Sequence, residues 1–145
     1  MTYDELKLDN QLCFPIYAAS RLVTRAYQPL LDNLGISYPQ YLVLLVLWER
    51  NGLPVTELGK KLMLNTNTLT PILQRMEKQG LLFKQKSETD SRKTIITLSW
   101  KAEQMKEEAR KIPLQLTCHL KESNLNFDEM LQLKNSLESL IQALR

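Results

Sequence analysis

The sequence has few of the residues on which most metal and catalytic sites depend. Its 145 residues include one histidine, His119, and two cysteines, Cys13 and Cys118, about a hundred residues apart. No cysteine and histidine spacing typical of zinc ligands occurs, and two cysteines are too few for a structural disulfide framework. A single histidine cannot form a catalytic or zinc cluster. We therefore expect no metal, no cofactor and no enzyme activity.

Long hydrophobic runs are also absent. The apolar stretch "YLVLLVLW" has eight residues, whereas roughly 20 are needed to span a bilayer. The N-terminal "MTYDELKLDNQ" contains acidic residues and no apolar core segment, so it does not resemble a signal peptide. These absences predict a cytoplasmic protein without a membrane partner. Thiols in that compartment are normally reduced, and a disulfide there is usually transient, catalytic or sensory.

The charge of the chain is unevenly distributed. The net charge is +3, but residues 58–94 hold eight Lys and Arg against three acidic residues, a net +5, which leaves −2 for the remainder. A basic segment of this kind is either a solvated surface or a site for nucleic acid, and charge alone does not decide between them.

The spacing of apolar residues predicts a mainly helical protein. Apolar residues recur every three or four positions from Leu12 to Leu30, which predicts a long first helix. "SYPQYLVLLVLWER" begins with a helix-start signal and predicts a second, buried helix. A short third helix is expected in "LPVTELGKKL", beginning at Pro54. "NTNTLTPILQRMEKQG" predicts a fourth helix, with capping side chains at its start and Gly80 at its end.

After Gly80 the pattern changes to that of strands. "LLFKQKS" and "KTIITLS" are strand-like, and the polar "ETDSR" between them predicts an antiparallel hairpin. From Ser99 the helical period returns, with a break at Pro113, and a last helix with an apolar stripe extends from Phe127 to Leu144.

This order of elements predicts a winged helix–turn–helix, mainly α with a small β-hairpin wing. We expect one domain, residues 1–145. Within it, residues 36–98 form the DNA-binding region, and residues 1–34 and 99–145 supply helices for a homodimer interface.

The second helix of the helix–turn–helix carries side chains that suit DNA reading. DNA-binding proteins of this class place the start of that helix against base edges in the major groove. Thr, Asn and Gln can contact base edges, and Arg and Lys can hold phosphates or guanine. Polar residues also cap helices, but this helix has more of them than a cap needs. The predicted contact residues on it are Thr66, Asn67, Thr68, Thr70, Gln74 and Arg75.

Cys13 lies beside aromatic residues in "QLCFPIYAAS". Only the thiolate of a cysteine attacks peroxide, and an ordinary thiol, with a pKa of about 8.5, is mostly protonated at neutral pH. Proline is tolerated in the first turn of a helix, so Pro15 is compatible with a helix that begins at about Phe14. Cys13 would then lie at the positive end of the helix dipole, which favours an anion. The alternative is a small buried core cysteine.

Four stretches resemble the organic hydroperoxide resistance repressor branch of the MarR family. They are "LCFPIYAASRLVTRAYQPLL", "ISYPQYLVLLVLWE", "LTPILQRMEKQGLL" and "SETDSRKTIITLS". The resemblance extends over nearly the whole chain. It implies a homodimeric winged-helix repressor that releases a pseudo-palindromic double-stranded DNA operator when an organic hydroperoxide oxidises a cysteine.

The resemblance also implies roles for individual residues of the sensing site. Cys13 matches the peroxide-reactive cysteine of the family, and Cys118 matches the resolving thiol of its two-cysteine members. Tyr27 and Tyr38 match tyrosines that hydrogen-bond the sulfur from the other subunit, and Tyr17 matches another pocket residue. The family pattern also allows a helix that begins earlier and kinks at Pro15. We expect the remaining pocket surface to include Phe14, Ile16 and Trp48.

In the wing, "DSR" matches an Asp-x-Arg motif of the same family. By this resemblance Arg92 enters the minor groove of DNA and Asp90 orients it. Lys84 and Lys86, in the preceding strand, are further predicted DNA contacts.

Other functions remain compatible with the sequence. A MarR-type repressor triggered by a small aromatic ligand is one. A thiol peroxidase, with Cys13 peroxidatic and Cys118 resolving, explains both cysteines but not the threonine-rich helix, the wing or the basic segment. An interaction module that does not bind DNA is another. Cys118 itself has a structural alternative, as a core cysteine among Leu114, Leu116 and Leu120.

Overall fold

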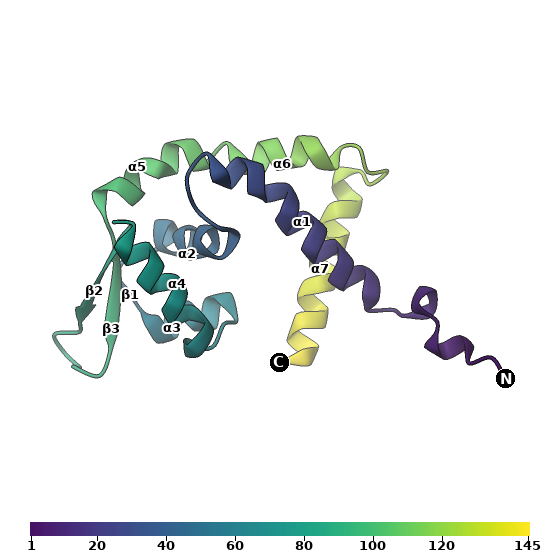
Figure 1. Cartoon of the computed structure of the whole chain (residues 1–145), viewed down its shortest axis with the longest axis horizontal. Helices are drawn as coiled ribbons and strands as arrows, with labels where there is room; N and C mark the ends of the chain where they lie inside the picture. The colour runs from purple at the N-terminus through teal and green to yellow at the C-terminus, as the bar shows by residue number, and fades with distance from the viewer. The chain divides into compact units, whose positions relative to one another are not determined.

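The computed structural model describes residues 1–145, which group into two compact units, residues 1–112 and 113–145 (Figure 1). The elements in chain order are the 3-10 turns η1 Asp4–Leu6 and η2 Leu8–Asn10, α1 Phe14–Asp32, α2 Tyr38–Glu49, β1 Leu53–Pro54, α3 Val55–Leu62, α4 Thr66–Lys78, β2 Leu82–Lys86, β3 Thr94–Leu98, α5 Trp100–Ala109, α6 Ile112–Leu120 and α7 Phe127–Leu144. The predicted mainly helical winged fold is confirmed. No helix is both long and apolar enough to cross a membrane.

The core of residues 1–112 surrounds α2. Ser37 caps this helix by accepting the N–H of Gln40, and Gln40 Oε1 accepts the N–H of Ser37 in return. Such a reciprocal box satisfies two backbone donors at the helix start. Val43, Leu44 and Leu47 are fully buried. The predicted buried second helix is therefore confirmed, and α2 contacts α1, α3, α4 and α5.

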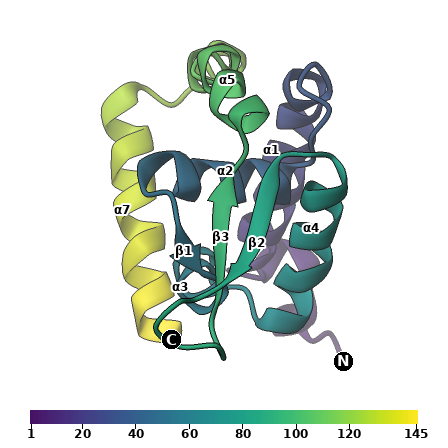
Figure 2. The same cartoon turned by 90° about the vertical axis from the view of Figure 1, so that its left-hand side faces the viewer.

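The small sheet has three strands in the order β1-β3-β2, all antiparallel (Figure 2). The hairpin β2–β3 agrees with the prediction. The third helix, however, begins at Val55 rather than at Pro54, because Leu53 and Pro54 pair with β3 opposite Ile96 and Ile95. Two residues are too short a run for alternation of apolar and polar residues to reveal a strand in the sequence.

The first helix begins at Phe14, with Cys13 at its N-cap position and Pro15 in its first turn. Of the two starts considered from the sequence, the later one is therefore observed. Many apolar residues along and just before α1 are solvent-exposed in the chain, among them Leu12, Phe14, Ile16, Tyr17, Leu22 and Val23.

The helical segment predicted after Ser99 forms two helices, α5 and α6, and the break between them lies before the predicted position at Pro113. The break lies at Arg110 and Lys111, between α5 and α6, rather than at Pro113. Pro113 is the second residue of α6, a position where its missing N–H costs no helical hydrogen bond. The last helix, α7, is capped by Asn126, whose Oδ1 accepts the N–H of Glu129, and none of its residues is buried.

Gly59 allows the turn between α3 and α4 to close. A Cβ at this buried position would lie 2.8 Å from the backbone oxygen of Leu64, closer than real Cβ contacts. We predict that Gly59→Ala lowers the free energy of unfolding by about 1–3 kcal/mol, as for other overpacked sites. Urea denaturation measures this, with the exposed neighbour Lys60→Ala as control. An unchanged midpoint for Gly59→Ala would contradict the close approach.

Candidate functional site: a helix-start thiol, a tyrosine cluster and a DNA-facing surface

Cys13 presents an exposed thiol at the start of α1. Its carbonyl accepts the N–H of Tyr17 at 3.2 Å, so the backbone of Cys13 begins the helix. The first-turn N–H groups of Phe14 and Ile16 have no partner within the helix, and Pro15 has none to offer. Cys13 therefore lies at the positive end of the helix dipole. The exposure of Cys13 in the chain disagrees with the alternative of a small buried core cysteine.

Tyr27, Tyr38 and Tyr41 form an aromatic cluster where α1 packs on α2. The ring centroids of Tyr27 and Tyr38 are 4.9 Å apart, and those of Tyr41 lie 5.7 Å from Tyr27 and 6.3 Å from Tyr38. The sequence prediction included the first two residues and missed Tyr41, which is buried. The spacing of three between Tyr38 and Tyr41, which places both on one face of a helix, was the available signal.

Burial keeps the phenols of this cluster protonated. Desolvation, with smaller effects of Tyr38 and Tyr41, raises the pKa of Tyr27 to about 12. Burial likewise raises the pKa of Tyr38 and of Tyr41. All three hydroxyls are therefore neutral at physiological pH and can donate a hydrogen bond to an anion.

Cys13 and the tyrosine cluster are far apart within one chain. Cys13 precedes Tyr27 by fourteen positions along α1, which corresponds to about 21 Å at the α-helical rise. Tyr17 lies near Cys13 on the same helix, is exposed, and has the guanidinium of Arg21 over its ring at 5.4 Å. A hydrogen bond from Tyr27 to the sulfur therefore requires two copies of the chain.

Trp48 does not line this surface, contrary to the sequence prediction. Its indole N–H donates to the carbonyl of Ala102 at 3.0 Å and fixes the ring against α5. Phe14 and Ile16, the other predicted pocket residues, are partly exposed on α1 next to Cys13. Cys118 is exposed on α6, within residues 113–145, which is contrary to the alternative of a core cysteine there.

The start of α4 exposes the predicted DNA-reading residues. Asn65 supplies the cap, because its Oδ1 accepts the N–H of Thr68 at 2.9 Å. The side chains of Thr66, Asn67 and Thr68 are therefore not needed for capping. Those three, together with Gln74 and Arg75, are exposed, and Thr70 is half-buried.

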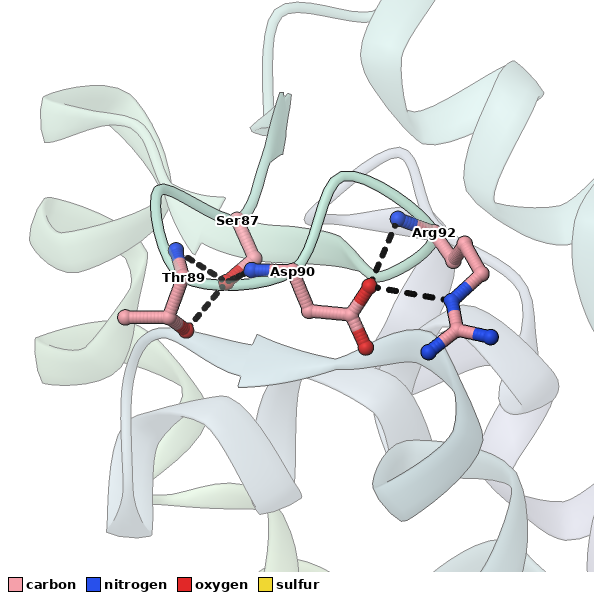
Figure 3. A network of polar contacts seen from close by, with 4 residues as sticks. All are labelled: Ser87, Thr89, Asp90 and Arg92. Carbon is pink, nitrogen blue, oxygen red and sulfur yellow. Dashed lines mark hydrogen bonds and ion pairs between the residues drawn. The ribbon is translucent and has the colours of Figure 1, made fainter.

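The wing holds Arg92 by a short hydrogen-bond network (Figure 3). Asp90 Oδ1 accepts the backbone N–H of Arg92 at 3.0 Å and its Nε–H at 3.2 Å. Ser87 Oγ accepts the N–H groups of Thr89 and Asp90, which closes the loop. Both bonds from Arg92 lower the pKa of Asp90. The Arg92 side chain is 90% exposed, so its guanidinium extends from the wing into solvent with one nitrogen held.

Two lysines lie on β2 of the same wing. Lys84 is half-buried and Lys86 is exposed. Together with α4 and the Arg92 loop, β2 therefore brings the three parts of the predicted DNA-binding surface, a helix, a strand and a loop, into one fold.

The fold and this surface define a winged helix–turn–helix regulator. A family profile of the transcriptional regulators SarA/Rot matches residues 25–109. The chain belongs to this family of MarR-like transcriptional regulators. It is 46% identical over 142 residues to the organic hydroperoxide resistance transcriptional regulator of Bacillus subtilis (strain 168), covering 98% of this chain and 95% of that protein.

Structures of AbfR, a protein of Staphylococcus epidermidis, are also similar. Reduced AbfR bound to DNA is 38% identical with a TM-score of 0.80, and covers 99% of this chain and 96% of its own. Overoxidised AbfR bound to DNA is 36% identical with a TM-score of 0.79, and both chains are fully covered. Disulfide-formed AbfR is 36% identical with a TM-score of 0.58, covering 97% of this chain and 92% of its own.

The tyrosine cluster generates a prediction for alkaline pH. A pKa of about 12 for Tyr27 in the folded state, above its ordinary value of 10.0, means that the folded state is stabilised below pH 10. That contribution is lost as pH rises from about 10 to about 12. Phenolate ultraviolet absorbance should show late titration by the three cluster tyrosines, with Tyr27 contributing the component near pH 12. Tyr27→Phe should remove that component and Tyr17→Phe should retain it. An unchanged amplitude near pH 12 in Tyr27→Phe would contradict this.

Proposed function

We propose that the protein is a homodimeric transcriptional repressor that releases its operator DNA when an organic hydroperoxide oxidises Cys13. The observation that carries this proposal is the exposed Cys13 thiol at a helix start, about 21 Å along that helix from Tyr27. Tyr27 and Tyr38 of a second copy can supply the hydrogen bonds to the thiolate that Tyr27 and Tyr38 of the same chain cannot reach.

A second copy also accounts for the exposed apolar surface. The apolar side chains of α1 are largely uncovered, and α7 has no buried residue. Exposed apolar side chains in such number on each of these two helices favour an interaction site on each. The exposed residues of α7 that a partner subunit would cover include Phe127, Leu131, Leu140, Ile141 and Leu144.

The DNA partner is a pseudo-palindromic double-stranded operator. In the dimer each α4 enters a major groove, where Thr66, Asn67, Thr68, Thr70 and Gln74 meet base edges and Arg75 meets phosphate or guanine. Lys84 and Lys86 contact phosphates, and Arg92, oriented by Asp90, enters the minor groove. Two such helices fit half-sites about 34 Å apart.

The sensing step is a two-electron oxidation of sulfur. The Cys13 thiolate attacks the distal oxygen of the hydroperoxide, the O–O bond breaks, and the alkoxide takes a proton and leaves as an alcohol. Cys13 becomes a sulfenic acid. The thiol of Cys118 of the partner subunit then condenses with it, releasing water and forming a disulfide. Apolar groups of Phe14 and Ile16 next to the sulfur favour an organic hydroperoxide over hydrogen peroxide.

The relatives support the disulfide, rather than oxidation alone, as the signal. AbfR is bound to DNA both in its reduced and in its overoxidised form. Its disulfide form, at nearly the same identity to this chain, has a TM-score of only 0.58 against 0.80 for the reduced form. The disulfide form of AbfR thus differs in conformation from the reduced form. A disulfide to Cys118 would act here by pulling the helices that set the spacing of the two α4 helices, which changes the match to the half-sites.

The wing assignment predicts a specific change in DNA affinity. Arg92→Ala should weaken binding to all duplexes and reduce the salt dependence by about one phosphate contact per subunit. Arg110→Ala is the matched control, because its Nε also binds a nearby carboxylate, that of Glu107, at 3.1 Å, but on α5. Fluorescence anisotropy at several salt concentrations measures both. Equal salt slopes for Arg92→Ala and wild type would contradict the wing contact.

The redox mechanism predicts different behaviour for the two cysteine variants. In a mobility shift on the chain's own upstream DNA, cumene hydroperoxide should release wild type with at least about a 100-fold loss of affinity, because specific binding exceeds non-specific binding by more than that. Cys13→Ser should stay bound. Cys118→Ser should form the sulfenic acid, give no cross-linked dimer on a non-reducing gel, and release DNA poorly.

The alternatives give distinct results in the same assays. Release of Cys13→Ser by a small aromatic compound would indicate a ligand-triggered repressor. Repeated peroxide turnover with a thiol reductant and no operator binding would indicate a peroxidase. A lack of salt-dependent duplex binding would indicate an interaction module. A cross-linked dimer that persists in Cys118→Ser would exclude Cys118 as the resolving thiol.

A further inference from the structure

Gln40 is a buried polar residue in the first turn of α2. It is 3% exposed, and with Ser99 it is one of two buried polar residues in the chain. It lies between Tyr38 and Tyr41 of the aromatic cluster. Its Oε1 completes the capping box with Ser37, and its Nε2 donates to Oε1 of Gln79 at 2.9 Å. Any movement of this turn is therefore transmitted to Gln79.

Gln79 is the residue at which α4 ends. Its backbone N–H closes the last turn on the carbonyl of Arg75, and its Nε2 donates to the carbonyl of Gly35, in the turn between α1 and α2. The carbonyl of Gln79 accepts a hydrogen bond from Nζ of Lys101. The carbonyl of the next residue, Gly80, accepts one from the hydroxyl of Ser99. The end of α4 is thus bonded to the α1–α2 turn, to α2 and to the start of α5.

The arrangement has a physical consequence. Hydrogen bonds are directional, and a bond that is partly shielded from water, such as that between Gln40 and Gln79, costs more to leave unpaired than one at the surface. The first turn of α2 and the end of α4 are joined by the Gln40–Gln79 bond, and the two helices are in contact, so we expect these two segments to move together. Apolar packing alone between these helices would allow sliding without such a cost.

We propose that the Gln40–Gln79 hydrogen bond is the link through which the sensing site positions the DNA-reading helix α4. This inference rests on the proposed function. When the hydroxyl of Tyr38 loses its contact with the sulfur of the partner subunit, the first turn of α2 shifts. Gln40, in that same turn, then moves Gln79 and the end of α4. Displacement of α5 reaches the same point through Lys101. Neither glutamine touches DNA or the sulfur; both are positioning residues.

The test uses full-length Gln79→Met. This substitution retains the length of the side chain but removes both hydrogen bonds of its amide group, those to Gln40 and to the Gly35 carbonyl. Operator affinity is measured for the reduced and the hydroperoxide-treated protein, and sulfenic acid formation at Cys13 is followed by mass spectrometry. We expect the operator affinity of the reduced variant to stay within about threefold of that of reduced wild type, and the rate of Cys13 oxidation to be unchanged. The ratio of the operator affinity of the reduced protein to that of the oxidised protein should fall at least about tenfold. Gln104→Met, at an exposed position on α5, is the control.

Further variants separate coupling from a structural role. Gln40→Met should lower the ratio of reduced-state to oxidised-state affinity by the same factor as Gln79→Met. The double variant should lower it no further than either single variant, because both single variants remove the Gln40–Gln79 bond. Gln79→Glu keeps an acceptor for the amide of Gln40. It should retain most of the wild-type ratio of reduced-state to oxidised-state affinity, and it is the variant to measure if Gln79→Met does not fold.

The outcomes distinguish the two proposals. A Gln79→Met protein that binds more weakly in both states, with the wild-type ratio, would overturn the link and leave the redox mechanism intact. Additive effects of the two methionine variants on the ratio would overturn it as well. Wild type that stays on its operator after the Cys13–Cys118 disulfide has formed would overturn the proposed function, and the link with it.

Discussion

The burial of α2 is the constraint on which the rest of this structure depends. A helix that is apolar on nearly all sides is stable in water only when other elements cover it. Here α1, α3, α4 and α5 do so. The covering elements include both α1, which begins directly after Cys13, and α4, which begins with Thr66 and is the proposed DNA-reading helix. The same helix therefore supplies hydrophobic stabilisation and connects the two functional regions.

The polar residues of α2 gain their significance from this packing. Tyr38 and Tyr41 face α1, where burial raises the pKa of each phenol. Gln40, between them, faces the end of α4 and pairs with Gln79. The bond between the buried Gln40 and the half-buried Gln79 offsets part of the cost of desolvating their amides, and in our proposal it fixes the position of α4.

In the proposed mechanism, redox sensing is a property of two copies of the chain. Cys13 is exposed at the start of α1, whereas the phenols able to stabilise its thiolate lie about 21 Å further along that helix. Dissociation of the dimer would thus remove both the activation of the thiol and the spacing of the DNA-reading helices. The proposed coupling of oxidant to operator follows from this shared dependence on one interface.

The sequence by itself determined the order and type of nearly all elements, because helix periodicity, caps and strand alternation are local properties: the caps Ser37 and Asn65 lie at the starts of two helices that the sequence predicted. Resemblance added the candidate residues of the thiol site and the wing. Only the tertiary structure decided that Trp48 bonds Ala102, that Leu53 pairs with β3, that Tyr41 joins the cluster and that Gln40 meets Gln79. Each of these is a contact between segments distant in the chain, or a short element that exists only through such a contact, and no local pattern encodes which buried surfaces pack together.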